Sequence, residues 1–313
     1  MASFVRAAII GVGLIGGSLG MAMRWRRIAR EVVGVARVPE TIGVARARGA
    51  IDRGTTDPVE GVAGADLVVL ATPPELVVSM ARQVLPYLGA GAIVTDVASV
   101  KREIVREIEP AIDPDKGVAF VGGHPMAGNE GRGVAAASAE LFEGSVYLIT
   151  RTPRTDGAAV DRIATLARAL GARPMIVDPE AHDRAVARVS HLPYLLAAAL
   201  MGAAESETAA AGPSFLGATR VAGSPVSLWA QICRLNRPEI VEALRAFRDE
   251  LDRLEGALAD GADIDALLER ARRARLKLSP RTEPDTPAPR ESGSRNDSPL
   301  PAPRQSGSRG ERT

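Results

Sequence analysis

The stretch VRAAIIGVGLIGGSLGMAMRW, residues 5–25, decides the fold. A short apolar run, VRAAII (5–10), leads directly into GVGLIG, which spaces three glycines as G-x-G-x-x-G. A helical pattern, GSLGMAMRW, follows the glycines. This strand–turn–helix setting is the one that a dinucleotide-binding loop requires, whereas the glycine spacing alone is weak.

Each glycine of this loop has a predicted role. Gly11 allows the tight turn, Gly13 lets the backbone approach a pyrophosphate, and Gly16 permits close helix–strand packing. The helix that begins at Leu14 and Ile15 presents N–H groups and a positive dipole end to the phosphates. We therefore predict that these five residues bind the cofactor; a glycine turn without a ligand is the alternative.

Further apolar runs alternate with helical patterns up to residue 177. They are EVVGVA (31–36), ADLVVLA (65–71), GAIVTDV (91–97), GVAFV (117–121), SVYLIT (145–150) and RPMIVD (173–178). Near-continuous apolar strands separated by helices predict a parallel sheet that is covered on both faces. Residues 1–177 are accordingly predicted to form a doubly wound α/β Rossmann domain.

The loops after two of these strands bear on the cofactor. The acidic residue that usually binds the ribose hydroxyl is replaced by Ala36, and Arg37 follows it. Because a guanidinium can bind a 2′-phosphate, the sequence favours NADP over NAD, unless Arg37 is merely solvated. Thr72 and Pro73 end another strand and are predicted to line the cofactor cleft, with a plain strand–helix turn as the alternative.

Strand patterns stop after Asp178, and four helices are predicted instead. The first contains AHDRAVARVSHLPYLLAAALMGAAESE (181–207); in the third, six apolar residues between Ile240 and Leu258 recur at helical spacing. We predict a helical substrate and dimerisation domain over 178–279 that forms a homodimer, with a self-contained bundle as the alternative. The Pro-, Ser-, Gly- and Arg-rich residues 280–313, with the repeat PAPRESGSR and PAPRQSGSR, predict a disordered tail.

Bulk composition excludes several functions. The 39 basic and 38 acidic residues balance, which argues against nucleic-acid binding. The N-terminal run reads as a strand and a turn, and no apolar stretch suits a membrane span. The single cysteine, Cys233, fits a reducing compartment, so we expect a cytoplasmic protein. No spacing of His, Cys and carboxylates indicates a metal site.

Three more segments carry chemistry: TDVASVK (95–101), GGHPMAGNEGRG (122–133) and TRVAGSPVSLW (219–229). Together with VSHLPY (189–194), they resemble the prephenate and arogenate dehydrogenases of tyrosine biosynthesis, over about Val5 to Leu278. This resemblance implies oxidative decarboxylation of prephenate to 4-hydroxyphenylpyruvate, with hydride transfer to NAD(P). The alternatives are arogenate as the substrate, or a dinucleotide-binding regulator without turnover. A β-hydroxyacid dehydrogenase is disfavoured because no lysine lies between Asp178 and Leu276.

The resemblance also implies roles for individual residues. His124 matches the catalytic histidine, and Ser99 the serine that hydrogen-bonds the substrate hydroxyl and the histidine. A neutral imidazole suits a proton acceptor at physiological pH. A loop histidine and a helix N-cap are the respective alternatives. The predicted substrate-binding residues are Arg220, which would bind a carboxylate, His191, Asn129, Trp229, and Tyr194 in place of a second histidine of some members.

Two of these residues also have structural alternatives. Arg220 could instead form a surface ion pair, and His191 could be a buried structural histidine. The third histidine of the chain, His182 in PEAHDR, is predicted to lie on the surface.

Overall fold

A computed structural model of the protein describes residues 3–129, 131–259, 261 and 264–278. Its first half is built on a six-stranded parallel sheet in the order β3-β2-β1-β4-β5-β6. The strands are β1 (Phe4–Ile10), β2 (Ala29–Val35), β3 (Arg53–Thr55), β4 (Leu67–Leu70), β5 (Ile93–Asp96) and β6 (Ala119–Val121). The order reverses between β1 and β4, which is the switch point of a doubly wound fold. The predicted fold class is therefore confirmed.

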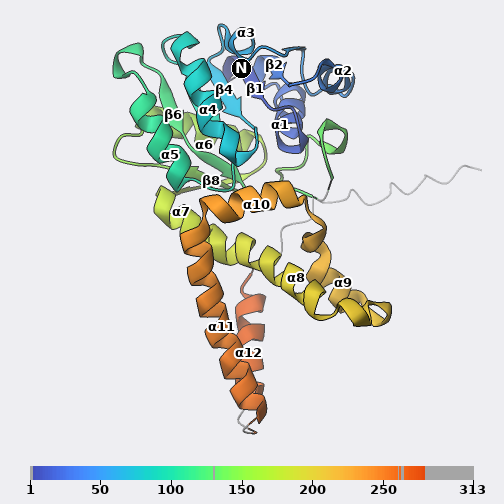
Figure 1. Ribbon diagram of the computed structural model, residues 1–313. Helices are drawn as coiled ribbons and strands as arrows, with labels where there is room; N and C mark the ends of the chain where they lie inside the picture. The colour runs from blue at the N-terminus through green and yellow to red at the C-terminus, as the bar shows by residue number, and fades with distance from the viewer. Residues whose placement is uncertain (1–2, 130, 260, 262–263, 279–313) are drawn as a thin grey trace, which may run out of the picture.

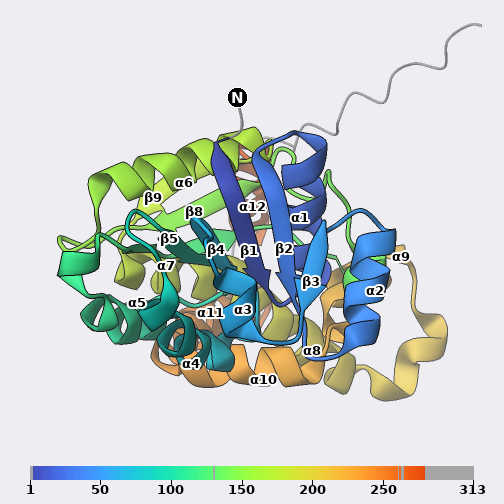
Figure 2. The same cartoon turned by 90° about the horizontal axis from the view of Figure 1, so that it is seen from above.

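Helices cover both faces of this sheet (Figure 2). They are α1 (Leu14–Trp25), α2 (Pro39–Ala47), α3 (Pro58–Val62), α4 (Pro74–Val84), α5 (Arg102–Ile108) and α6 (Gly157–Ala169). Successive residues of β1 point to opposite faces: Ala7 and Ile9 pack in one apolar cluster, and Ala8 and Ile10 in another. The continuous apolar strands of the sequence thus reflect burial on both sides.

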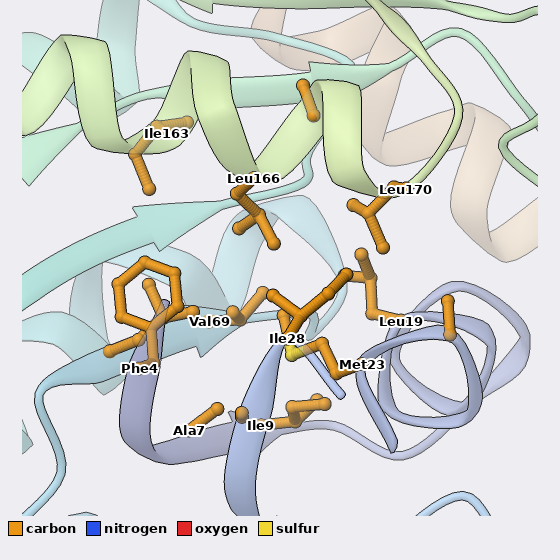
Figure 3. Close-up of a cluster of buried hydrophobic side chains, with 14 of the residues drawn as sticks. Phe4, Ala7, Ile9, Leu19, Met23, Ile28, Val69, Ile163, Leu166 and Leu170 are labelled. Atoms are coloured by element: carbon orange, nitrogen blue, oxygen red, sulfur yellow. The ribbon is translucent and has the colours of Figure 1, made fainter. Parts of the chain in front are cut away.

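The cluster on the α1 and α6 face joins distant parts of the chain (Figure 3). Leu19 and Met23 of α1 meet Ile163, Leu166 and Leu170 from α6 and its end, above the strands. Such contacts hold α1, the helix that follows the glycine loop, against the sheet.

A second sheet departs from the expectation. The run SVYLIT forms β8 (Val146–Thr150) and RPMIVD forms β9 (Arg173–Val177), but both lie in a separate three-stranded sheet with β7 (Gly123–Pro125). The β7–β8 pair is antiparallel. The sequence missed β7 because its three residues are too few to show an alternating pattern. His124 therefore lies on a strand, and the pairing of β7 with β8 holds its backbone in place.

Six helices follow β9 in the described chain: α7 (Pro179–Val186), α8 (Leu192–Ala203), α9 (Pro213–Thr219), α10 (Val226–Leu235), α11 (Arg237–Ala259) and α12 (Ile264–Leu276). A π-helical turn, Ala187–His191, joins α7 to α8, so the predicted first long helix is present. The short α9 was not predicted. Figure 1 shows α10 lying beneath the nucleotide-binding half, while α11 and α12 project away from it.

The projecting helices leave apolar side chains uncovered. Ile240, at the start of the predicted stripe, is buried, but Leu251 is 47% exposed and Leu258 72% exposed. Leu268 on α12 is exposed as well. A self-contained bundle would bury such a stripe, so these faces favour association.

The run Pro179–Ala203 is the one described helix that is long and apolar enough to cross a membrane. Its first turns, however, are anchored to the nucleotide-binding half through Asp183, which accepts hydrogen bonds from the backbone of Lys101 and Arg102. We interpret the apolar residues of this run as packing surface within the helical domain. The predicted tail, 280–313, lies outside the described residues.

Candidate active site

The ends of the central strands place the glycine loop beside the histidine region. In the sheet register, Ile10 of β1 pairs with Leu70 of β4, and Leu70 pairs with Asp96 of β5. All three residues therefore lie at the carboxyl edge, where doubly wound sheets bind ligands.

The glycine loop has the geometry of a phosphate cradle. Gly11 has φ +99°, and a Cβ there would lie 2.4 Å from the Ala71 carbonyl oxygen. A Cβ on Gly16 would lie 2.1 Å from the oxygen of Gly11. At Gly13, by contrast, a Cβ would meet nothing within 4 Å, so this glycine borders open space. Two glycines thus serve the packing of the loop, and the third leaves room for a ligand.

Other features of this edge suit a dinucleotide. Leu14 and Ile15 form the first turn of α1, which has no acidic residue and no side-chain cap at Gly13. Thr72 Oγ1, just after β4, is buried without a hydrogen-bond partner in the described part of the chain. A helix N-terminus attracts phosphate, and an orphaned hydroxyl offers a further polar contact.

Two other predicted cofactor residues also lie here. Pro73 is exposed and precedes α4, which begins at Pro74. Arg37 lies two residues beyond β2 and is exposed, with no hydrogen bond or ion pair to the residues that the structure describes. Its guanidinium is available to a ligand at this edge.

A buried ion pair holds the loop after β5. Lys101 Nζ lies 2.5 Å from Asp96 Oδ2 and also donates to the carbonyl oxygens of Ala98 and Val100, at 2.7 and 3.0 Å. Both charged side chains are fully buried. Burial raises the pKa of Asp96 and lowers the pKa of Lys101, while the opposite charge of each partner opposes the shift.

This ion pair positions two predicted catalytic residues. The loop that Lys101 clamps contains Ser99, which is half-buried. Asp96 Oδ1 accepts a hydrogen bond from the backbone N–H of Gly123, directly before His124. Ser99 is not the N-cap of α5, because that position belongs to Lys101 and the Asp183 carboxylate accepts the Lys101 and Arg102 N–H groups. The helix-cap alternative for Ser99 is therefore wrong.

His124 is part of a chain of hydrogen bonds. Its Nδ1 lies 2.9 Å from Nε2 of His182, and Nδ1 of His182 lies 2.8 Å from Oδ1 of Asp183. His182 is 1% exposed, so the prediction that it lies on the surface is wrong. Burial lowers the pKa of His124 well below its ordinary value and that of His182 to about 2, so both rings are neutral at physiological pH.

The tautomer of His191 follows from its hydrogen-bond partner. The Asn236 amide nitrogen lies 2.9 Å from the Asp183 carbonyl oxygen and 3.2 Å from His191 Nδ1. A carbonyl requires a donor, so this amide nitrogen faces both groups and His191 Nδ1 accepts. The proton of His191 is then on Nε2, which is buried without a partner among the described residues. Burial lowers the pKa of His191 to about 4, against the Asp183 charge and a backbone hydrogen bond with Ser99, so its ring is neutral at physiological pH.

Two predicted substrate residues join His191. The Tyr194 and Trp229 rings are stacked, with centroids 3.8 Å apart and an interplanar angle of 2°. Trp229 meets His191 edge-on, with centroids 6.1 Å apart. The structure therefore brings these three residues together from α10 and the start of α8.

Two other predicted substrate-binding residues are exposed. Asn129 is exposed, and its side chain accepts a hydrogen bond from the Gly131 N–H. Arg220 is exposed in the 3-10 turn Arg220–Gly223, in the connection between α9 and α10. Figures 1 and 2 show this connection at the far end of α10 from α7, which carries His182. Within one chain, the turn that carries Arg220 therefore lies away from α7.

Sequence reasoning missed His182, Asp183 and Asn236. A signal existed for the first two, because Pro179, His182, Asp183 and Val186 are spaced as one helical face, and all four are buried. No local pattern marks Asn236, which acts through contacts more than 40 residues away. No group of His, Cys, Asp and Glu in the described chain is arranged to hold a metal.

Comparison with known proteins gives this geometry a family. Residues 19–176 match the family description "Prephenate dehydrogenase, nucleotide-binding domain", and residues 178–272 match "Prephenate dehydrogenase, dimerization domain". The chain belongs to the prephenate dehydrogenase family. The resemblance read from the motifs is thereby confirmed, and this member of the prephenate dehydrogenase family is a nicotinamide-dependent oxidoreductase with a small-molecule substrate.

Individual relatives agree. The chain is 32% identical to prephenate dehydrogenase of Bacillus subtilis over 256 residues, 79% of this chain and 68% of the relative. It is 34% identical to cyclohexadienyl dehydrogenase of Zymomonas mobilis over 292 residues, 89% of this chain and 97% of the relative. The helical half is accordingly the dimerization domain of a prephenate dehydrogenase family member.

A solved structure bears on the cofactor. The crystal structure of prephenate dehydrogenase from A. aeolicus, in complex with hydroxyphenyl propionate and NAD+, has a TM-score of 0.79 and 28% identity, covering 88% of this chain and 98% of that one. A nicotinamide dinucleotide is therefore the cofactor class of this family member, and the glycine loop fits it.

Proposed function

We propose that this chain catalyses the oxidative decarboxylation of prephenate to 4-hydroxyphenylpyruvate in tyrosine biosynthesis. The observation that carries the proposal is the pair of buried neutral imidazoles, His124 and His191. One can accept a proton and the other can donate a hydrogen bond. The substrate has both needs, a hydroxyl that loses a proton and carboxylate or carbonyl oxygens that must be held.

The reaction needs one proton acceptor and no external acid. When bound, the nicotinamide supplies the hydride acceptor. His124 takes the proton of the ring hydroxyl as the carbonyl forms at the hydroxyl-bearing carbon. The bond from the quaternary carbon to its carboxylate then breaks, carbon dioxide leaves, and the electron pair moves through the ring to make a phenolate. The phenolate recovers the proton from His124, which resets the base.

Other residues position the substrate in this proposal. Ser99 hydrogen-bonds the hydroxyl and His124, and the clamp of Lys101 on the Ser99 loop supports that role. His191 donates from Nε2 to a substrate oxygen, and the stacked Tyr194 and Trp229 wall the pocket. Asn129, with its exposed side chain, is the remaining proposed contact.

Arg220 is proposed to bind a substrate carboxylate through its planar guanidinium. Because its turn lies away from α7 within one chain, we propose that the second subunit of a homodimer delivers it. The exposed apolar faces of α11 and α12 support such a dimer. Mixed dimers test this point: combining inactive His124→Asn and Arg220→Ala chains should restore turnover, and no restoration would contradict delivery from the partner.

We further propose that residues 1–177 bind the cofactor and residues 178–279 form the substrate and dimerisation domain, in a cytoplasmic enzyme that prefers NADP. Arg37 supports the preference because its guanidinium has no partner among the described residues at the β2 end.

The test is a two-by-two assay of prephenate or arogenate with NAD or NADP, following the absorbance of the reduced nicotinamide. Prephenate should give reduced dinucleotide and 4-hydroxyphenylpyruvate. Turnover of arogenate alone, with tyrosine as product, would replace the substrate. Dinucleotide binding without turnover of either compound would overturn the proposal in favour of a regulator.

A further inference from the structure

The side of His124 that carries Nδ1 is occupied by two residues that no motif identified. His182 and Asp183 are consecutive in α7, yet both reach across to the nucleotide-binding half. His182 contacts His124 on β7, and Asp183 accepts hydrogen bonds from the Lys101 and Arg102 N–H groups at the start of α5, at 2.8 and 3.1 Å. The two residues thus connect the predicted base to a helix end.

The donors around Asp183 fix its protonation. Oδ1 lies within 2.8 Å of both the Lys101 N–H and the His182 ring, and Oδ2 lies 3.1 Å from the Arg102 N–H. Each carboxyl oxygen accepts one backbone N–H, and these two donors, together with the charges of Lys101 and Arg102, stabilise the ionised form. Asp183 is therefore a carboxylate, even though burial raises its pKa against these hydrogen bonds.

The direction of each hydrogen bond in the chain then follows. A carboxylate only accepts, so Nδ1 of His182 carries a proton and donates it to Asp183. In a neutral ring, the other nitrogen of His182, Nε2, is an acceptor. His124 must therefore donate from Nδ1, which leaves its Nε2 as a bare lone pair.

We propose that His182 and Asp183 form a positioning relay that holds His124 in the tautomer with a basic Nε2 and steadies the imidazolium that forms when this nitrogen takes a proton. The proposal rests on the proposed function and deepens it. No proton needs to leave the relay, because the Asp183 carboxylate acts through the polarised His182 ring. His182 and Asp183 act through His124 and need not touch the substrate.

The exposed fractions of the three histidines support different roles for them. His182 and His191 are 1% and 0% exposed, whereas His124 keeps 6% of its surface accessible. Nε2 of His124 has no hydrogen-bond partner among the residues that the structure describes. A packing role for His182 could be filled by an apolar residue without the cost of burying two ring nitrogens.

The tautomers can be measured without substrate. The chain has three histidines, so NMR of protein labelled with heavy nitrogen in histidine gives three pairs of ring signals. We expect His124 and His182 to be protonated on Nδ1 and His191 on Nε2, assigned with single-histidine variants. A His124 ring protonated on Nε2 in the wild-type protein would overturn the relay.

Kinetics of two variants at one position provide the second test. His182→Leu removes the acceptor for His124 Nδ1–H, and we expect kcat to fall about 10²-fold or more, with KM for the dinucleotide unchanged. His182→Gln can still accept from His124 through its oxygen and donate to Asp183 through its nitrogen, so it should recover most of the lost kcat. Thermal unfolding confirms that both variants fold.

The outcomes separate the two proposals. If wild-type protein turns over neither prephenate nor arogenate, the proposed function fails, while the NMR tautomers still decide the relay. If the wild type is active and His182→Leu keeps its kcat, or loses it while His182→Gln fails to restore it, the relay is wrong and His182 is structural.

Discussion

The glycine loop and the histidine cluster share the carboxyl edge of one sheet, but they are built in opposite ways. The loop uses backbone from six consecutive residues, Gly11 to Gly16, and its ligand site is the space left by a missing side chain. The cluster uses side chains, and its central contact joins His124 to a residue 58 positions later. Atoms added to the loop either meet backbone, as at Gly11 and Gly16, or occupy space for the ligand, as at Gly13, whereas a site made of side chains depends on fixed partners.

The largest effect should come from the base of the cluster. His124→Asn removes the proton acceptor, and we expect kcat to fall about 10²–10⁴-fold, the usual contribution of general-base catalysis. The affinity for the dinucleotide should stay unchanged because the loop is a separate structure. Assays of turnover measure the fall in kcat, and calorimetric titration measures the affinity for the dinucleotide. A parallel loss of affinity would show that the two sites are not independent.

The next effect concerns the ion pair beneath the cluster. Lys101→Met leaves the Asp96 carboxylate buried without a counter-charge, and such a change costs about 3–5 kcal/mol of folding free energy. Lys116→Met is the matched control, because Lys116 is exposed and its ammonium donates a hydrogen bond to the Pro86 carbonyl oxygen. The control should stay within about 0.5 kcal/mol of wild type in denaturant unfolding. Equal losses of folding free energy in the two variants would mean that the buried ion pair contributes no more to stability than an exposed lysine does.

The same contrast explains what the sequence could predict. The glycine loop could be predicted because the strand, the glycines and the helix are adjacent in the chain, so their order and spacing identify the site. The doubly wound sheet could also be predicted from local sequence, because strands that are buried on both faces appear as continuous apolar runs. His124 and Ser99 were identified from motifs around them, not from their contacts.

What failed depends on contacts between distant residues. His182 was assigned to the surface because PEAHDR is polar, but a polar residue on a buried helical face is satisfied by partners that the local sequence does not name. The splitting of the strands into two sheets was missed because β7 is three residues long and its antiparallel pairing with β8 leaves no periodic trace. The position of Arg220 relative to His124 likewise depends on how helices associate, which no spacing specifies.

Two alanine substitutions within the glycine loop test the backbone side of the comparison. Gly16→Ala places a Cβ 2.1 Å from the Gly11 oxygen, and we expect a loss of about 1–3 kcal/mol in folding free energy. Gly13→Ala meets nothing within 4 Å, so stability should be kept while the dinucleotide Kd rises roughly tenfold, about 1.4 kcal/mol. Thermal unfolding and calorimetric titration separate these effects. A destabilised Gly13→Ala protein with normal affinity would show that this glycine, too, serves packing.

The smallest effect should come from Arg37, a predicted cofactor residue that acts through its charged side chain. Arg37→Ala removes a charge-assisted contact to a 2′-phosphate, typically worth about 1.5–3 kcal/mol when fully formed and less at an exposed site. We therefore expect KM for NADP to rise by about tenfold or less, while KM for NAD stays unchanged. Arg30→Ala is the matched control, because Arg30 is an exposed arginine on β2, close to the end of the strand that lies away from Arg37. If Arg37→Ala leaves the ratio of the two KM values unaltered, the guanidinium is solvated, and cofactor choice lies with the backbone loop alone.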